Sequence, residues 1–358
     1  MNGFHSERLQ RAWDVLADAV AAGDIPGAVA VVGRRGFPDV GPVALGHAAI
    51  HPERRPMTPD TVFDLASLTK VVGTAMAFWT SLERGRLRVD DEVAAVLPAF
   101  AATGIRVRHL LTHTSGLPAW RDLTAAGSDP AERLLAALRQ PPEQPPGRMV
   151  VYSDLGFITL GAVLSQVAGL SLPELARREV FAPLGMEETR WLPPEAWLPR
   201  IAATEWADDL GTWAWGRVHD ENARGLGGIA GHAGLFSTAA DLARLGRALL
   251  NGGAGVLSPR TVEVMGRNAT ANLNDDRTLG WQARGRGGNS AGDLMTEAAF
   301  GHTGFTGTCI WIDPDLGLFA VLLTNRVHLG RAPTTAAIQR LRPRFHNAVV
   351  AALEDVDV

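Results

Sequence analysis

Ser67 and Lys70 are the residues whose types and spacing most directly suggest chemistry, because they read Ser-x-x-Lys at the start of a predicted helix. The helix is expected from Ser67 to Glu83, where apolar residues and good helix formers dominate, and Gly85 follows in a C-cap position. Residues three apart on a helix share one face, with Cβ atoms ~5–6 Å apart. Lys70 can therefore reach the Ser67 hydroxyl, and a desolvated lysine with a depressed pKa can activate a serine nucleophile.

Two polar triplets stand beside predicted secondary structure further along the chain. The first, Tyr152–Asp154, reads Tyr-Ser-Asp and precedes a predicted helix over residues 155–168. It holds the only tyrosine of the chain. The second, His302–Gly304, reads His-Thr-Gly in a glycine- and threonine-rich run that leads into a predicted strand. Each triplet offers groups that could transfer a proton or hold a polar substrate atom.

The order Ser-x-x-Lys, Tyr-x-(Asn-like), (Lys or His)-Thr-Gly resembles that of penicillin-recognising serine hydrolases. The 85 residues from Ser67 to Tyr152 and the 150 from Tyr152 to His302 resemble the separations in class C β-lactamases. D-alanyl peptidases, D-aminopeptidases and β-lactamase-like esterases belong to the same superfamily. Segments 109–117 and 237–242 also resemble that superfamily, and the resemblance covers roughly residues 20–330.

The resemblance implies an α+β fold of the β-lactamase/transpeptidase type. In that fold an antiparallel sheet is flanked by the terminal helices, a mainly helical lobe lies beside it, and the active site occupies the groove between them. The implied division is an α/β domain over 1–66 and 232–358 and a helical domain over 67–231. The chain's own pattern agrees with one sheet assembled from both ends around a helical insertion. Strands are expected at 28–32, 40–49, 308–312 and 317–324, with a helix capped by Ser6 and a last helix over 335–353.

The resemblance also implies roles for the first three residues. Ser67 would be the nucleophile and form an acyl-enzyme, and Lys70 would be its neighbour and proton acceptor. Tyr152 matches the position that the superfamily uses for proton transfer. Beside an ammonium group a phenol ionises more easily, so Tyr152 could deprotonate Ser67 or the deacylating water.

The strand that carries His302 is expected to form one wall of the cleft. Gly304 would let backbone approach the substrate closely, and Phe305 would offer its N–H as an oxyanion donor beside that of Ser67. His302 and Thr303 would hold a substrate carboxylate or carbonyl. An ordinary histidine loses its proton above about pH 6.5, so binding of an anion by His302 is expected to weaken there.

Two residues depart from the β-lactamase pattern. Asp154 replaces an asparagine, and a carboxylate only accepts hydrogen bonds whereas an amide also donates. Asp154 would also hold Lys70 protonated, which shifts the role of base toward Tyr152. His302 replaces a lysine and removes a permanent positive charge. Both departures argue against efficient β-lactam turnover.

The expected function is a serine hydrolase that acts through an acyl-enzyme on an ester or a D-amino-acid amide, with weak or no β-lactamase activity. Two alternatives stay open: a true class C-like β-lactamase, and a penicillin-binding or sensing module that acylates without turnover. The partner is expected to be a small-molecule or peptide substrate, bound by a monomer or a weak homo-oligomer. No cofactor is expected.

Composition excludes several other classes. The 358 residues are 46% hydrophobic and 20% charged, as in ordinary globular proteins, and the net charge of −4 argues against a nucleic-acid partner. No apolar stretch approaches the ~18 residues that span a bilayer. Residues 1–10 lack the apolar core of a secretory signal. The protein is therefore expected in the cytoplasm as the chain stands, or outside it if a leader was removed.

The remaining candidates have competing interpretations. Imidazole and carboxylate suit zinc, but the spacing of His219, Asp220 and His232 matches no ligand motif, so no metal is expected. His109 and His113 are interpreted as structural, and Cys309 as a buried small side chain. Five of the ten tryptophans lie in residues 191–215. They either pack under a proline-rich loop or form an apolar wall for the acyl group.

Overall fold

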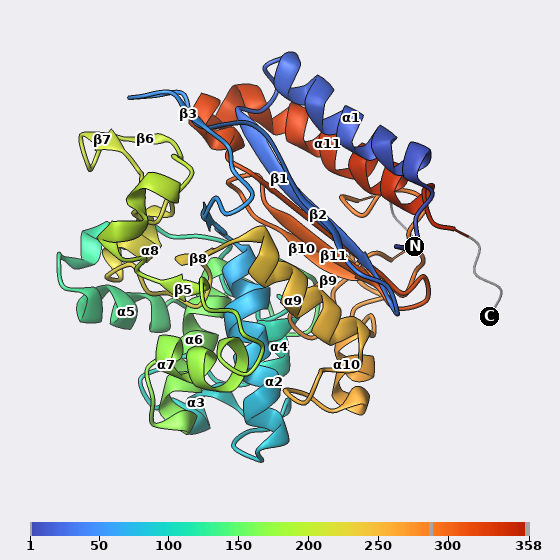
Figure 1. Ribbon diagram of the computed structural model, residues 1–358. Coiled ribbons are helices and arrows are strands. Elements are labelled where there is room, and N and C mark those ends of the chain that lie inside the picture. The colour runs from blue at the N-terminus through green and yellow to red at the C-terminus, as the bar shows by residue number, and fades with distance from the viewer. Residues whose placement is uncertain (1, 286–288, 355–358) are drawn as a thin grey trace.

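The computed structural model describes residues 2–285 and 289–354, which fold around a seven-stranded antiparallel sheet. Its strand order is β3-β2-β1-β12-β11-β10-β9, so the first and last long strands lie side by side at its centre (Figure 1). The strands are β1 (Gly27–Arg34), β2 (Val40–Ala49), β3 (Arg55–Pro56), β9 (Gln282–Ala283), β10 (Phe300–Thr303), β11 (Cys309–Asp313) and β12 (Leu318–Thr324). The sheet is therefore assembled from both ends of the chain, as the sequence predicts.

The central strands are apolar on both faces because the sheet separates two hydrophobic cores. On β1, Val29 and Val31 enter the core shared with the helical lobe, whereas Ala28 and Ala30 enter the core under the terminal helices. Successive side chains of a strand point to opposite faces, which accounts for this alternation. A strand that is buried on both faces reads as a continuous apolar run, and β12 is buried along its whole length.

The terminal helices α1 (Ser6–Ala21) and α11 (Arg331–Val350) pack against each other on one face of the sheet (Figure 1). The helix α9 (Ala239–Leu250) covers β1 and β12 from the other face. The prediction that Ser6 caps the first helix is wrong by one residue. His5 occupies the N-cap and makes no side-chain capping bond.

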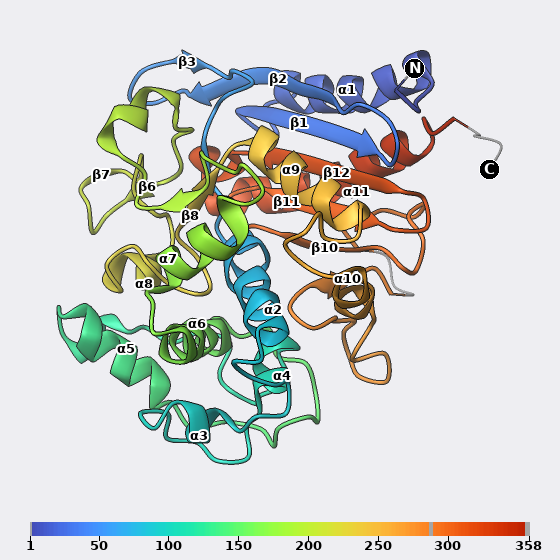
Figure 2. The same ribbon diagram turned by 60° about the horizontal axis from the view of Figure 1, so that its bottom comes forward.

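Below the sheet lies a mainly helical lobe (Figure 2). Its longest helix, α6, begins after Ser153, whose hydroxyl accepts the Gly156 N–H, and ends at Gly169 in the left-handed conformation. The α-helices of the lobe and its surroundings are α2 (Met76–Glu83), α3 (Val93–Val96), α4 (Val107–Leu111), α5 (Pro130–Leu138), α6 (Asp154–Ala168), α7 (Leu172–Ala176), α8 (Glu221–Gly225) and α10 (Pro259–Gly266). The π-helical segments are η1 (Lys70–Ala75) and η3 (Arg177–Phe181). The 3₁₀-helical segments are η2 (Thr124–Ala126), η4 (Glu195–Arg200) and η5 (Arg326–Leu329).

The predicted helix over 67–83 is not a regular α-helix from its first residue. Lys70–Ala75 forms a π-helical stretch, and α2 continues from Met76. Gly73 sits in this stretch against the ring of Trp191, where a Cβ atom would lie 2.7 Å from the ring. The Thr74 hydroxyl donates to the Gly231 carbonyl at 2.7 Å. These packing constraints come from distant residues, so the local pattern of good helix formers does not reveal the π-helix.

A three-stranded sheet joins the two parts of the molecule, in the order β4 (Phe63–Asp64), β8 (Leu235–Ser237), β5 (Arg190–Trp191). The hairpin of β6 (Trp206–Ala207) and β7 (Thr212–Trp213) lies beyond it. Within the described residues no individual helix has both the length and the apolar composition to cross a membrane. Only α6 together with 172–181 passes that test, and these two segments are bent by 73°.

Candidate active site

Ser67 lies between β4 and the first turn of η1, at the junction of the sheet and the helical lobe. The residue before it, Ala66, has a φ of +46°, a conformation that non-glycine residues rarely adopt. The Ala66 N–H donates to Asp64 Oδ1 at 2.8 Å, and this bond holds the turn. Backbone strain of this kind persists only where the surroundings enforce it, and here it presents a half-buried serine at the junction.

Lys70 is fully buried and reaches three oxygen atoms with its ammonium group. Nζ lies 3.1 Å from Ser67 Oγ, 3.1 Å from the His232 carbonyl and 2.7 Å from Asp154 Oδ1. It also lies 4.8 Å from the centre of the Tyr152 ring. The three polar candidates Ser67, Lys70 and Asp154 therefore form one connected cluster, with Tyr152 against it.

The charge of Lys70 differs from the first expectation. Burial opposes a buried ammonium, but the Asp154 carboxylate, assisted by Tyr152, outweighs burial and raises the pKa of Lys70 above its ordinary value. The expectation of a depressed lysine pKa is therefore wrong. The expectation that Asp154 keeps Lys70 protonated agrees with the geometry, since the two groups form a direct ion pair.

Tyr152 is positioned by the residue that starts α6. The Ser153 hydroxyl donates to the Pro118 carbonyl at 2.6 Å, and the Ser153 N–H donates to His113 Nδ1 at 3.0 Å. The centre of the His113 ring lies 4.5 Å from the centre of the Tyr152 ring. The Arg277 guanidinium lies 5.3 Å from the Tyr152 ring centre. The tyrosine is therefore surrounded by Lys70, a buried imidazole and an arginine.

The loop after β10 is held against the backbone that leads to Ser67. The Thr306 hydroxyl donates to the Asp64 carbonyl at 2.8 Å, and the Thr308 hydroxyl donates to the Leu65 carbonyl at 3.1 Å. A Cβ atom on Gly304 would lie 2.3 Å from that same Leu65 oxygen, so only glycine fits there. In residues 2–285 and 289–354, neither the Ser67 N–H nor the Phe305 N–H donates to a protein acceptor. Each of these two contacting segments thus carries one backbone N–H without a protein acceptor among the described residues.

His302 differs from its expected role as a titrating anion site. Burial, with the positive charges of Arg277 and Lys70, holds the pKa of His302 well below its ordinary value. Nδ1 donates to the Thr303 carbonyl at 2.8 Å, so the neutral ring carries its proton there and Nε2 is a buried acceptor. The expected loss of anion binding above pH 6.5 is therefore wrong, because the ring is already neutral. Thr303 is half-buried on the neighbouring position of β10.

Of the three residues considered for zinc, Asp220 and His232 lie beside Lys70, whereas His219 bonds elsewhere. Atoms of Asp154, Asp220 and His232 lie within 4.8 Å of one another, and His232 Nε2 lies 2.8 Å from Asp220 Oδ1. Burial opposes the charge of Asp220, but His232 and Lys70 outweigh it and lower the pKa of that carboxyl. The Lys70 ammonium already supplies a cation to this cluster. His219 instead bonds to Glu205 at 3.0 Å.

Two residues beside Tyr152 are not among the predicted site residues. His113, which the sequence analysis interprets as structural, accepts the Ser153 N–H, and burial holds its pKa well below the ordinary value. Arg277 carries no sequence signal, since only the fold brings it to the tyrosine. The tryptophans also divide. Trp191 packs in the core, whereas Trp206 is half-exposed and lines a cavity.

The sequence profile of the Beta-lactamase family matches residues 14–342. A relative from Escherichia coli (strain K12) named "Putative D-alanyl-D-alanine carboxypeptidase" is 33% identical over 309 residues, which cover 76% of this chain and 70% of the relative.

One similar solved structure is EstCE1, which is described as a hydrolase with promiscuous acyltransferase activity. Its TM-score is 0.79 at 24% sequence identity, and the match covers 96% of this chain and 99% of the EstCE1 chain. A penicillin-binding protein homologue from Caulobacter crescentus has a TM-score of 0.75 at 24% identity, covering 97% and 98% of the two chains. These structural likenesses show a β-lactamase/transpeptidase-type fold. The family profile and the Escherichia coli relative show that this chain belongs to the β-lactamase family.

Proposed function

We propose that the protein is a serine hydrolase that transfers the acyl group of an ester or a D-amino-acid amide to Ser67 and then to water, with weak or no β-lactam turnover. The observation that carries the proposal is the contact of the fully buried Lys70 Nζ with Ser67 Oγ at 3.1 Å and Asp154 Oδ1 at 2.7 Å. A buried ammonium beside a hydroxyl stabilises negative charge that develops on that oxygen. The free N–H groups of Ser67 and Phe305 add donors for the carbonyl oxygen.

Proton transfer is assigned to Tyr152. The raised pKa of Lys70 keeps it charged near neutral pH, so the lysine donates hydrogen bonds and does not accept the serine proton. In this proposal Tyr152 is the general base, which takes the Ser67 proton while Oγ bonds to the acyl carbon. The bond to the leaving alcohol or amine then breaks, and Tyr152 gives it that proton. Water repeats the sequence on the acyl-enzyme, which releases the acid and restores the Ser67 hydroxyl.

Two features support weak activity on β-lactams. His302 is neutral and donates its one N–H to a backbone carbonyl, so it offers no cation to a β-lactam carboxylate. Asp154 accepts and cannot donate to the amide carbonyl of a β-lactam. A simple ester has neither the carboxylate nor the amide carbonyl of a β-lactam, so the residues at positions 302 and 154 do not reduce its binding.

Turnover of p-nitrophenyl butyrate tests the proposal. We expect sustained release of p-nitrophenolate from the parent and its loss in Ser67→Ala. A single stoichiometric burst would instead support a module that acylates without turnover, and equal rates in the two proteins would exclude Ser67 as the nucleophile.

D-Alanyl carboxypeptidase activity is a second candidate, favoured by the relative's name and by Arg277. The guanidinium lies 5.3 Å from the Tyr152 ring centre, and its Nε and Nη2 donate to Asp275 Oδ2 at 2.9 and 2.7 Å. We assign its remaining N–H groups to the carboxylate of a peptide whose terminal residue is the leaving group. Release of D-alanine from an acyl-D-alanyl-D-alanine peptide tests this candidate. Arg277→Gln should raise the KM for the peptide more than the KM for p-nitrophenyl butyrate.

A further inference from the structure

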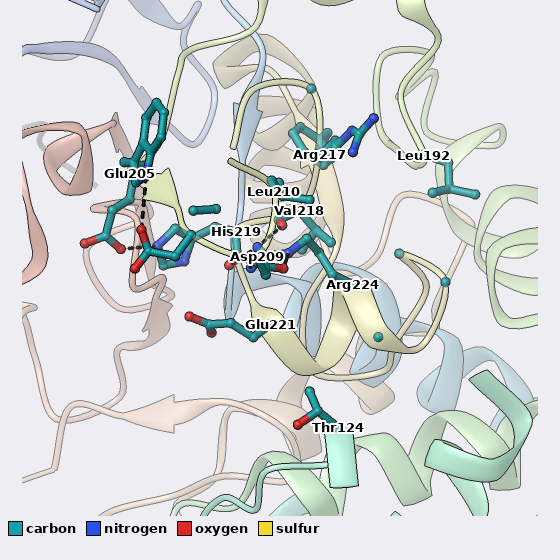
Figure 3. A pocket seen from close by; sticks show the side chains of 18 of the residues that line it. Thr124, Leu192, Glu205, Asp209, Leu210, Arg217, Val218, His219, Glu221 and Arg224 are labelled. Atoms are coloured by element: carbon teal, nitrogen blue, oxygen red, sulfur yellow. Dashed lines mark hydrogen bonds and ion pairs between the residues drawn. The ribbon is translucent and has the colours of Figure 1, made fainter. Parts of the chain in front are cut away.

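A cavity of about 840 Å³ lies beside the Ser67 cluster without containing it. It is bounded by the segment from Glu205 to His219, by α8 and by Leu192 (Figure 3). The volume lies in the range of small-molecule sites, which is ~300–1,000 Å³. Apolar side chains supply much of the wall, among them Leu192, Trp206, Leu210 and Phe236.

A single chain segment separates the cavity from the candidate active site. His219 and Glu221 line the cavity, whereas the Asp220 carboxylate between them bonds to His232 beside Lys70. The His219 N–H donates at 2.6 Å to Asp64, the same carboxylate that holds the turn before Ser67. Residues 219–221 therefore contact both the cavity and the groups around Lys70.

Phe305 is not among the described residues that line the cavity, but its ring contacts two residues that do. Its ring is 46% exposed and stacks at 5.7 Å on His219, with the Arg331 guanidinium 5.8 Å away on the cavity wall. A carbonyl bound at the Phe305 N–H has one substituent on the side of Tyr152, which protonates the leaving group. The His113 and Arg277 side chains that surround Tyr152 do not line the cavity in the described part of the chain. The other substituent, the acyl chain, can pass the Phe305 ring toward the cavity.

Among the described residues, some charged side chains on the cavity wall form ion pairs and others do not. Arg224 binds both oxygens of Asp209 at 3.0 and 2.8 Å, and Arg331 pairs with Glu205 and Glu221. Within residues 2–285 and 289–354, Arg217 makes no ion pair or hydrogen bond. In Figure 3 its guanidinium extends toward the Leu192 edge of the cavity. Arg133 also lines the cavity and, among the described residues, its side chain donates to the Gly127 carbonyl alone. The Asp208 carboxylate, also on the wall, accepts from Trp206 Nε1 and forms no ion pair within those residues.

We propose that this cavity receives the acyl group of the substrate and favours an apolar chain that ends in a carboxylate. The inference rests on the proposed hydrolase function, since it assigns the acyl side of the same reaction. The apolar wall accepts the chain, and Arg217 meets the carboxylate. Exposed arginines bind carboxylates in a bidentate geometry that lysine cannot match.

The test compares p-nitrophenyl hexanoate with the p-nitrophenyl monoester of adipic acid, which has the same number of carbons and an added carboxylate. We expect the ratio of kcat/KM for the adipate ester to that for hexanoate to fall about three- to fivefold in Arg217→Gln, the size expected for an exposed ion pair. In Arg217→Glu the preference should turn toward p-nitrophenyl 6-aminohexanoate. Arg217 makes no described contact, so its replacement does not threaten folding.

Arg11→Gln, an exposed arginine of α1, is the matched control for a change in net charge and should leave the ratio unchanged. The cavity assignment is wrong if both esters are hydrolysed in a Ser67-dependent reaction and the ratio is the same in Arg217→Gln as in the parent. If the parent hydrolyses neither ester, the proposed function itself fails, and this assignment fails with it.

Discussion

Replacing Asp154 with asparagine tests the ion pair on which the site depends. The change keeps the side-chain shape but removes the charge that faces a fully buried Lys70, and the Asp154 side chain is itself only 18% exposed. Breaking a buried pair by removing one partner typically costs about 3–5 kcal/mol. The asparagine oxygen still accepts a hydrogen bond, so the expected loss for Asp154→Asn lies at the low end, about 3 kcal/mol.

A double-mutant cycle isolates the pair from other effects. The free energy of unfolding in urea at pH 7.5 would be measured for the parent, Asp154→Asn, Lys70→Met and the combined variant. The combined variant leaves no unpaired ammonium, so it should be more stable than the sum of the single changes predicts. We expect a coupling energy of about 1.5–3 kcal/mol, within the range for contacting residues.

The pH dependence of this coupling follows from the direction of the lysine shift. Because folding raises the pKa of Lys70, the stabilisation is fully present below the ordinary lysine value of about 10.4 and is lost as pH rises through the folded value. The coupling should therefore be equal at pH 6.5 and pH 8.5. The exposed pair of Arg177 and Glu174 is the control, and its cycle should show no measurable coupling. A coupling below about 0.5 kcal/mol for Lys70 and Asp154 would refute this reasoning.

Three further outcomes follow from the geometry. Tyr152→Phe should lower kcat on p-nitrophenyl butyrate by ~10²–10⁴-fold with little change in KM, and a raised KM with unchanged kcat would make the tyrosine a binding residue. Asp154→Asn combined with His302→Lys should raise kcat/KM for nitrocefin by at least about tenfold, since it supplies a donor and a cation. The burial and positive charges that lower the pKa of His302 also disfavour a lysine cation there, so the gain should be larger at pH 6.5 than at pH 8.5. An unchanged or lower value at both pH values would point to cleft shape as the limit. Cys309 is buried and its thiol pKa is raised to about 11, so iodoacetamide at pH 8 should alkylate it only after unfolding, as intact mass would show.

Elements with a strong local pattern could be predicted from the sequence closely. The expected strand over 40–49 coincides with β2, and the helix expected at 155–168 is α6 with one more residue at its start. The hairpin of β11 and β12 lies within one residue of its prediction, because its Asp-Pro-Asp-Leu-Gly turn fixes the register. Alternating or continuous apolar residues and specific turn chemistry determine these elements locally.

Features made by contacts between distant segments could not be predicted in the same way. The π-helical stretch at Lys70 packs against Trp191 and bonds to Gly231, and the Asp64 carboxylate that bonds to Ala66 is itself held by the distant His219 N–H. The buried environment that keeps His302 neutral comes from Arg277 and Lys70, which lie at distant positions in the sequence. The residue types in a motif predict which groups lie at the site. The charge states of these groups depend on neighbouring side chains that only the folded structure brings close.

The most direct test of the central claim, acylation of Ser67, is peptide mapping of the covalent adduct. The parent would be treated with a fluorescent phosphonate probe, digested with trypsin and analysed by mass spectrometry. The tryptic peptide of residues 55–70 contains Ser67 as its only serine. We predict one adduct per chain, located on Ser67 in this peptide and absent from Ser67→Ala. Labelling of Ser67→Ala at the parent's rate, or an adduct in another peptide, would contradict the account.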